Sequence, residues 1–267
     1  MPRSRRSRAY RKTVSLLLAL ALFGAPCRAA EADPIHLRFE VFGGPGLHLL
    51  TLQVSVDQSG GRYSLAVDAE TRSLADLFVD LRSRIEARGR ISADALLPEA
   101  MRAETHRRGV ALHARVDYAA DGTVTAAVTP PPERLVTPAQ MRGTVDQLTA
   151  YLALARHLTS RGSCALALAV FDGRRRYDLS FTDLDPETLP GFVGLMQACR
   201  MSRHRIAGFP VDRDGTGTTD QGKLWFARLI PGDLMVPVRM EFGSEFGNFT
   251  ADLAELRGRG VDLHFTE

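Results

Sequence analysis

The sequence lacks the short motifs that organise common catalytic centres. It contains no H-E-x-x-H pair for zinc, no G-x-S-x-G elbow for a nucleophilic serine and no glycine-rich phosphate loop. Its 7 histidines are scattered, and its 3 cysteines form no C-x-x-C pair. No cluster therefore has the spacing of metal ligands, and we predict no catalytic residue, no metal and no cofactor.

Long apolar runs are also missing, except near the N-terminus. Residues 1–30 begin with several arginines, continue through an apolar segment from Val14 to Phe23 and end in small residues at Ala29 and Ala30. This is the order of a cleavable export signal, and the apolar segment is shorter than the roughly 20 residues that a membrane-spanning helix needs. We predict cleavage after Ala29 or Ala30, a periplasmic mature chain and no integral membrane span after signal removal.

Two other export routes match the same segment less well. Cys27 follows an apolar run, as in a lipid-anchored protein, but Gly24 and Pro26 fit an acylation site poorly. Arg5 and Arg6 suggest the twin-arginine route on an equally weak pattern. A soluble periplasmic protein is the preferred prediction.

Removal of the segment changes the sign of the net charge. The whole chain has 34 Lys and Arg against 31 Asp and Glu. Seven of those basic residues lie in residues 1–30, which leaves 27 against 31 and a net charge of about −4. A mildly acidic chain lacks the basic field that attracts phosphate backbones, so we predict no nucleic-acid binding.

Only Cys164 and Cys199 remain after Cys27 is removed. Two cysteines in an oxidising compartment are more often bridged than free, so we predict a disulfide between them, with free thiols as the alternative. The bridge would act as a structural staple, because the two residues do not form the C-x-x-C arrangement of redox-active pairs.

Alternating apolar and polar residues dominate the rest of the chain and predict β-strands. Asp121-Gly122 and Asp172-Gly173 are the clearest hairpin turns. A long loop rather than a domain linker is predicted from Asp212 to Gly222, so residues 31–267 form a single β-rich domain. The predicted strands cover 35–42, 47–56, 62–68, 110–118, 124–128, 164–171, 177–181, 196–205, 223–230, 236–242, 249–256 and 261–265.

The segment from Leu74 to Ile91 fits two periodicities. Leu77, Leu81 and Ile85 suit a helical face as well as a strand. A polar residue at every second position from Asp80 to Arg90 favours the strand.

One helix is predicted after the prolines at 130–132. Thr137 suits its cap, Pro138 its first turn, and the apolar residues from Val145 to Leu158 its buried face. A single amphipathic helix among many strands must lie against a sheet or fill an open barrel. The residues therefore predict a mainly β fold with one main α-helix.

The most distinctive local sequence is the turn after which Arg174, Arg175, Arg176 and Tyr177 follow one another. Guanidinium groups at a hairpin tip suit carboxylates, phosphates or anionic headgroups, so these four residues are candidates for ligand or partner binding. The structural alternative is an edge strand whose arginines pair with nearby acids. An ion pair between this tip and Asp146 would lock the helix to the hairpin.

Trp225 is a further candidate for partner binding. It is adjacent to Phe226, and consecutive strand residues point to opposite faces, so one of the two aromatic rings is expected to face outward. The outward ring would suit an acyl chain or the edge strand of a partner, with simple packing as the alternative.

Several segments together resemble a known family. They are GTVDQLTAYLALARHL at 143–158, VFDGRRRYDLSF at 170–181, IAGF at 206–209 and VPVRMEF at 236–242. These segments resemble the exported bacterial family known as domain of unknown function 3108, most strongly between residues 140 and 245. The resemblance implies a curled antiparallel sheet or open β-barrel of roughly a dozen strands with the helix packed in its concavity, similar to lipoprotein-carrier folds. It implies no established activity.

Three functions remain open on this basis. The preferred one is a non-enzymatic, periplasmic cell-envelope protein whose curved sheet binds a lipid, a lipopeptide or a protein partner. The alternative is an envelope hydrolase whose site is assembled only in the fold, with Asp172 and His204 as minimum candidates. A structural or assembly scaffold is the third.

Overall fold

The computed structural model describes residues 33–44, 46–71, 80–93, 95–210, 219–244 and 247–265. The predicted export signal at residues 1–30, the first part of the segment that begins at Leu74, and most of the predicted loop after Asp212 lie outside these ranges.

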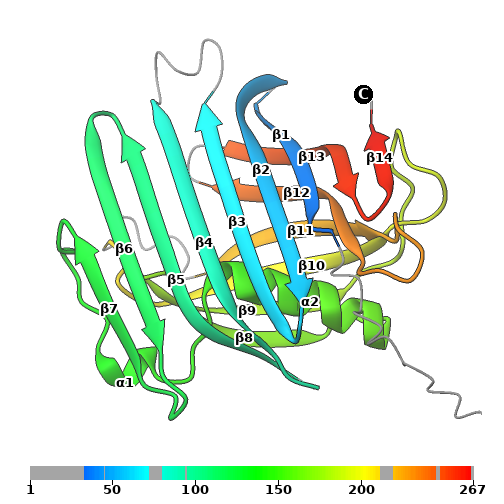
Figure 1. Ribbon diagram of the computed structural model, residues 1–267. Coiled ribbons are helices and arrows are strands. Elements are labelled where there is room, and N and C mark those ends of the chain that lie inside the picture. Colours follow the sequence, from blue (N-terminus) through cyan, green and yellow to red (C-terminus); the bar gives the residue numbers. More distant parts are fainter. Residues whose placement is uncertain are drawn as a thin grey trace, which may run out of the picture. The chain divides into compact units, whose positions relative to one another are not determined.

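The described strands form one antiparallel sheet of 14 strands (Figure 1). Its order is β7-β6-β5-β4-β3-β2-β1-β13-β12-β11-β10-β9-β8, and β14 pairs with β13. Most neighbours are consecutive in the sequence, which is the usual result when short turns connect antiparallel strands. The strands are β1 (Ile35–Gly43), β2 (Leu47–Ser59), β3 (Arg62–Thr71), β4 (Leu81–Ile91), β5 (Leu96–Arg107), β6 (Val110–Tyr118), β7 (Val124–Thr129), β8 (Leu166–Phe171), β9 (Arg176–Asp183), β10 (Gln197–Ala207), β11 (Thr219–Ala227), β12 (Val236–Ser244), β13 (Gly247–Gly258) and β14 (Val261–His264).

The pairing of β1 with β13 joins the two halves of this sheet. β1 leads into the run from β2 to β7, whereas β13 ends a second run that starts at β8. Alternation along β1 places Leu37 and Phe39 in the core and Arg38 and Glu40 on the opposite face. The prediction of a mainly β, curled antiparallel sheet is confirmed.

One long helix lies between the two arms of the sheet (Figure 1). The helix α2 (Gln147–Arg161) buries Leu154 and Leu158 among residues of β8 to β11, and Leu152 among residues that come mostly from β3 to β7. Since both arms pack on the same helix, the sheet curls around it. Side chains of α2 thus fill the concave side.

The predicted continuous helix is wrong, because the chain is interrupted between two helices. α1 (Pro138–Met141) starts at the predicted cap, where Thr137 and Gln140 bond reciprocally, and ends after one turn. The N–H of Val145 then donates to the carbonyl of Ala169 on β8 at 2.9 Å. Val145 therefore joins the sheet instead of the apolar face of a helix, and Asp146 caps the second helix, α2.

Two strand predictions change and one is confirmed. β5 was not predicted, since Pro98 and the spacing of its apolar residues conceal the alternation of a strand. β11 starts at Thr219, inside the predicted loop, and ends at Ala227 rather than Ile230. The described part of the ambiguous segment is the strand β4, as preferred.

Cys164 and Cys199 form the predicted disulfide, with their Cα atoms 5.7 Å apart. Both residues are completely buried. The bridge links Cys164, which precedes β8, to Cys199 on β10. It spans the intervening β9 and so holds together the strands at one end of the sheet.

The turn between β8 and β9 closes the curled sheet onto its opposite arm. Gly173 lies so near β6 that a Cβ atom there would be 2.8 Å from the Cβ of Ala114. Next to it, Nη2 of Arg174 donates to the carbonyls of Thr129 and Pro130, both at 3.0 Å. β7 and β8 therefore end the sheet without pairing with each other, and packing of this turn bridges the gap between the arms.

Replacing Cys164 with Ser should lower the melting temperature and remove its sensitivity to reductant. The bridge spans 35 residues. Closing a loop of that length lowers the entropy of the unfolded chain and so raises the free energy of unfolding by about 4 kcal/mol. Thermal unfolding with and without reductant measures both effects, and a variant with both cysteines changed to Ser controls for the remaining thiol. Identical melting curves for all three proteins would show that the bridge adds no stability.

Replacing Gly173 with Ala should destabilise the fold more than replacing Gly122 with Ala. Both glycines follow an aspartate and have positive φ, 92° and 80°, but only at Gly173 does an added Cβ meet other atoms. The shared backbone strain is about 1–2 kcal/mol, and overpacking at Gly173 adds about 1–3 kcal/mol. Denaturant unfolding gives the difference, and equal losses would contradict the close approach of the turn to β6.

Candidate functional site

A trough of about 920 Å³ lies on the outer face of the sheet. Strands β1, β2, β12 and β13 form its floor, and the segment Pro190–Phe192 together with Phe265 forms its wall. Its volume falls in the range of roughly 300–1,000 Å³ that small-molecule sites occupy. We refer to it as the main trough.

Glu40 is the centre of the polar network on the floor. Its carboxylate receives hydrogen bonds from Arg38 and from Oγ1 of Thr51, the latter at 2.7 Å, and lies 2.8 Å from Nε2 of His48. Arg38 also donates to Glu255 at 2.7 Å, and this hydrogen bond holds the pKa of Glu255 below its ordinary value. The floor is thus preorganised by charged side chains that satisfy one another.

Strand register explains why these distant residues meet. Glu40 lies opposite Thr51 on β2 and opposite Asp252 on β13. Residues that are directly opposite in an antiparallel pair point to the same face. An irregularity between Arg38 and Phe39 shifts the register and puts Arg38 opposite Glu255.

Aromatic rings border the polar floor. Phe192 and Phe265 stack with their centroids 4.6 Å apart, and Phe42 lies 5.4 Å from the ring of His48. The trough therefore combines convergent polar groups with apolar walls, which is the usual composition of a ligand site.

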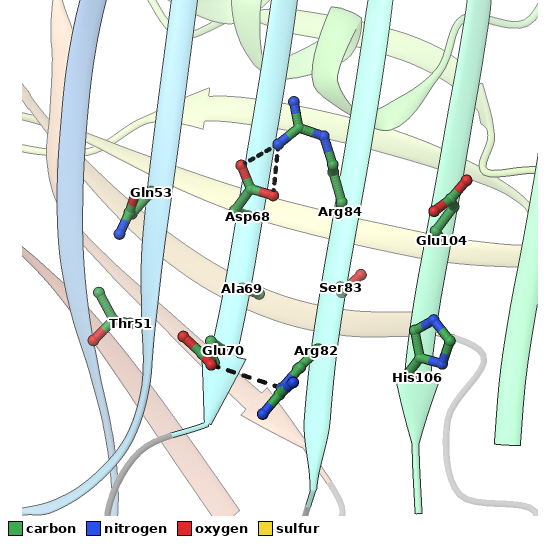
Figure 2. Close-up of a pocket in the computed structure, with 10 residues that line it drawn as sticks. All are labelled: Thr51, Gln53, Asp68, Ala69, Glu70, Arg82, Ser83, Arg84, Glu104 and His106. Carbon is green, nitrogen blue, oxygen red and sulfur yellow. Dashed lines mark hydrogen bonds and ion pairs between the residues drawn. The ribbon is translucent and has the colours of Figure 1, made fainter. Parts of the chain in front are cut away.

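A smaller pocket of about 260 Å³ adjoins the main trough across β2 to β5 (Figure 2). Thr51 and Gln53 line both pockets. Figure 2 shows the remaining charged side chains of this side pocket on three neighbouring strands, with an ion pair between Asp68 and Arg84 and a longer one of 3.7 Å between Glu70 and Arg82.

No three His, Cys, Asp or Glu side chains gather as a metal site within the described ranges. In the same ranges, no helix has both the length and the apolar character needed to cross a bilayer.

The arginines that the sequence suggested for ligand or partner binding make contacts within the chain. Arg174 donates to backbone carbonyls, as described above, and the guanidinium of Arg175 lies over the ring of Phe209 at 5.5 Å. Arg176 donates to the carbonyl of Gln140 at 3.2 Å and pairs with Asp178 at 2.8 Å. These contacts tie the β8–β9 turn to its surroundings.

Tyr177 and Trp225 are both buried. Trp225 belongs to the part of the core that includes Ala198 and Val238, whereas Phe226 belongs to the part that includes Leu154 and Leu158 of α2. The two rings therefore point to opposite faces, as predicted. The outward ring is that of Trp225, but its Nε1 donates to Glu187 at 2.9 Å and Lys223 lies 4.4 Å from its centre. The ring is therefore covered, although its cross-strand neighbour Arg239 lines the main trough.

Asp146 is fully buried and bonds within its own helix instead of pairing with the arginines. Its carboxylate accepts from the N–H and the hydroxyl of Thr149 at 2.9 and 2.6 Å. The hydroxyl of Thr149 is in turn 2.8 Å from that of Tyr63 on β3. The expected lock between helix and hairpin is wrong, and Asp146 links α2 to β3 through Thr149.

Asp172 and His204 have different partners. Asp172 accepts from the N–H groups of Arg174 and Arg175 in the turn. His204 lies on the exposed side of β10, 3.4 Å from Thr219. Among the described residues, each of the two side chains therefore contacts its own neighbours, and no hydrogen bond joins them.

Sequence reasoning missed the residues of the main trough. The alternation of β1 already placed Arg38, Glu40 and Phe42 together on one polar face, and this was the available signal. The pairing of β1 with β13, which adds Asp252 and Glu255, has no local signature in the sequence.

The fold and the trough define the class of this protein: a barrel-like antiparallel β protein with a polar pocket on its outer face. The chain belongs to the family described as Protein of unknown function (DUF3108), whose sequence model matches residues 38–254. The resemblance drawn from the sequence is confirmed.

Structure comparison shows the same fold in a protein of another family. The chain is similar to the crystal structure of a beta-barrel-like protein of domain of unknown function DUF1849 from Brucella abortus. The TM-score is 0.52 at 10% sequence identity, over 85% of this chain and 98% of that chain. No curated protein matches the sequence.

The variant Asp146→Asn should become more stable relative to wild type as the pH increases. Burial raises the pKa of Asp146 above its ordinary value of 3.8, so the stability that this group contributes is complete below pH 3.8 and is lost as the pH rises through the folded-state pKa. Asn does not titrate and escapes this loss. Denaturant unfolding across acidic to neutral pH measures the difference.

Asp121→Asn is the control with the opposite sign. Hydrogen bonds from Thr123 lower the pKa of Asp121, so wild type should gain stability over this variant as the pH rises. A difference between wild type and Asp146→Asn that does not change with pH would contradict the raised pKa.

Proposed function

We propose that the protein is a non-enzymatic component of the bacterial cell envelope, exported to the periplasm, which binds a ligand in the main trough. The observation that carries the proposal is the joining of a ligand-sized trough and a side pocket on one polar face. Both contain preformed networks of donors and acceptors beside apolar walls. A scaffold role needs no such pocket.

The position of the main trough favours a polar ligand over a lipid. A lipid held in the concave side would need space that α2 occupies, because Leu152, Leu154 and Leu158 are buried there. The floor of the main trough instead carries paired charges, which suit a ligand with many polar groups.

A second candidate function is the binding of a lipid or a lipopeptide. An apolar pocket of about 260 Å³ lies where the β8–β9 turn meets β7, lined mainly by apolar side chains such as Val128, Leu135 and Val136. Arg174 also lines it, so a short acyl chain would have a cation beside it. This pocket is smaller than a typical ligand site, which favours the main trough.

A blocking substitution tests the proposal. Gln53 is exposed and lines both the trough and the side pocket, so Gln53→Trp should obstruct both without disturbing the core. Arg115→Trp is the matched control, because Arg115 is on the outer face of β6 and outside both pockets. Native mass spectrometry of protein purified from the periplasm, and of protein mixed with envelope extract, should show a ligand on wild type and on the control.

Loss of that ligand from Gln53→Trp supports the proposal. Equal occupancy of all three proteins would overturn it, and a bound lipid would then point to the apolar pocket at the turn. Failure of wild type to retain any component of the extract would overturn it as well.

A further inference from the structure

Two rows of polar side chains cross the strands of the outer face. One row passes from strand to strand through directly opposed residues and consists of Asp252, Glu40, Thr51, Glu70, Arg82 and His106. The second row runs beside it through Arg38, Gln53, Asp68, Arg84 and Glu104. Together they connect the main trough to the side pocket, and Figure 2 shows the part of both rows from Thr51 and Gln53 to Glu104 and His106.

The charges along these rows nearly balance, because four arginines, counting Arg239 beside them, stand against five acids. In the main trough, Arg38 and Arg239 face Glu40 and Asp252. In the side pocket, two arginines stand against three acids. Most of these charged groups are also paired with one another, as in Glu40 with Arg38 and Asp68 with Arg84. A polyanion would meet no net field of opposite sign, and a polycation would meet an excess of only one negative charge, so the rows favour an uncharged ligand.

The spacing of the rows favours one kind of uncharged polymer. Neighbouring strands are about 4.8 Å apart, so the row from β13 to β5 offers one polar side chain per step over roughly 24 Å. An extended chain of hexoses advances by a similar distance per ring. An extended peptide advances only about 3.3 Å per residue and would fall out of step with the side chains.

The aromatic walls fit the same ligand. A sugar ring carries C–H groups on its faces and hydroxyls at its rim. Phe42 and Phe192 border the main trough, where they would pack on a ring face while the floor bonds its hydroxyls. Hydroxyls both donate and accept, so they match a floor that carries both guanidinium and carboxylate groups.

We infer that the ligand is an uncharged oligosaccharide that lies across the strands, from Phe192 at the main trough to His106 in the side pocket. This inference rests on the proposed function and specifies its ligand. The trough holds one end of the chain, and the side pocket lengthens the contact.

Calorimetric titration with linear, uncharged glucans of increasing length tests the inference. Long glucans should bind wild type at least about tenfold more tightly than short ones, because the extra rings add hydrogen bonds in the side pocket. Changing Glu104 to Gln together with His106 to Ala should remove this gain and leave short glucans unaffected, since both residues are exposed in the side pocket. Arg115→Ala is the control, and it should bind both lengths like wild type.

A second variant separates the trough from the side pocket. Phe192→Ala should weaken short and long glucans alike, because its ring borders the trough, and its melting curve verifies folding. Equal affinity for both lengths, or long-chain binding that survives the Glu104 and His106 changes, would overturn the inference. So would preferential binding of a uronic-acid oligosaccharide.

The proposed function can survive that failure. If the glucans do not bind but another component of the envelope binds wild type and is lost from Gln53→Trp, the sugar inference is wrong and the binding role stands. If the blocking variant retains every ligand of wild type, both are wrong.

Discussion

The pairing of β1 with β13 is the constraint on which the rest of the structure depends. It joins two runs of antiparallel strands from opposite ends of the described chain into one sheet. Its register also decides which side chains share a face, because a shift by one residue would exchange the buried and polar sets of a strand. Phe39 and Leu253 face the core in this register, and Glu40 and Asp252 lie together outside.

The filled interior is the reason why we propose binding on the outer face of the sheet. α2 contributes side chains to the core clusters of both arms, and the β8–β9 turn packs on β6 where the sheet does not pair with itself. The arginines after that turn act in this closure. Arg174 satisfies carbonyls at the end of β7, and such contacts are architectural. The sequence cluster that looked most like a site is therefore used to hold the arms together.

Local patterns were enough to predict most of the strands and the family, and the number of cysteines in the predicted exported chain was enough to predict the disulfide. Alternation along β1 to β3, and the Asp-Gly turns after β6 and β8, depend on neighbours in the sequence and so can be recognised there. The helix was predicted to be continuous because Val145 is apolar at helical spacing. Its N–H instead donates to β8, a tertiary contact that has no local signal in the sequence. The main trough was missed for the same reason, since its residues come from strands that only the sheet order brings together.

Mapping of a bound ligand by amide chemical shifts would test the central claim most directly. Titration of labelled protein with a ligand recovered from envelope extract should shift amides of β1, β2 and β13 beside Glu40, Thr51 and Asp252, and leave those of α2 unchanged. Shifts confined to α2 or to the turn from Asp172 to Arg175 would contradict a binding site on the outer face.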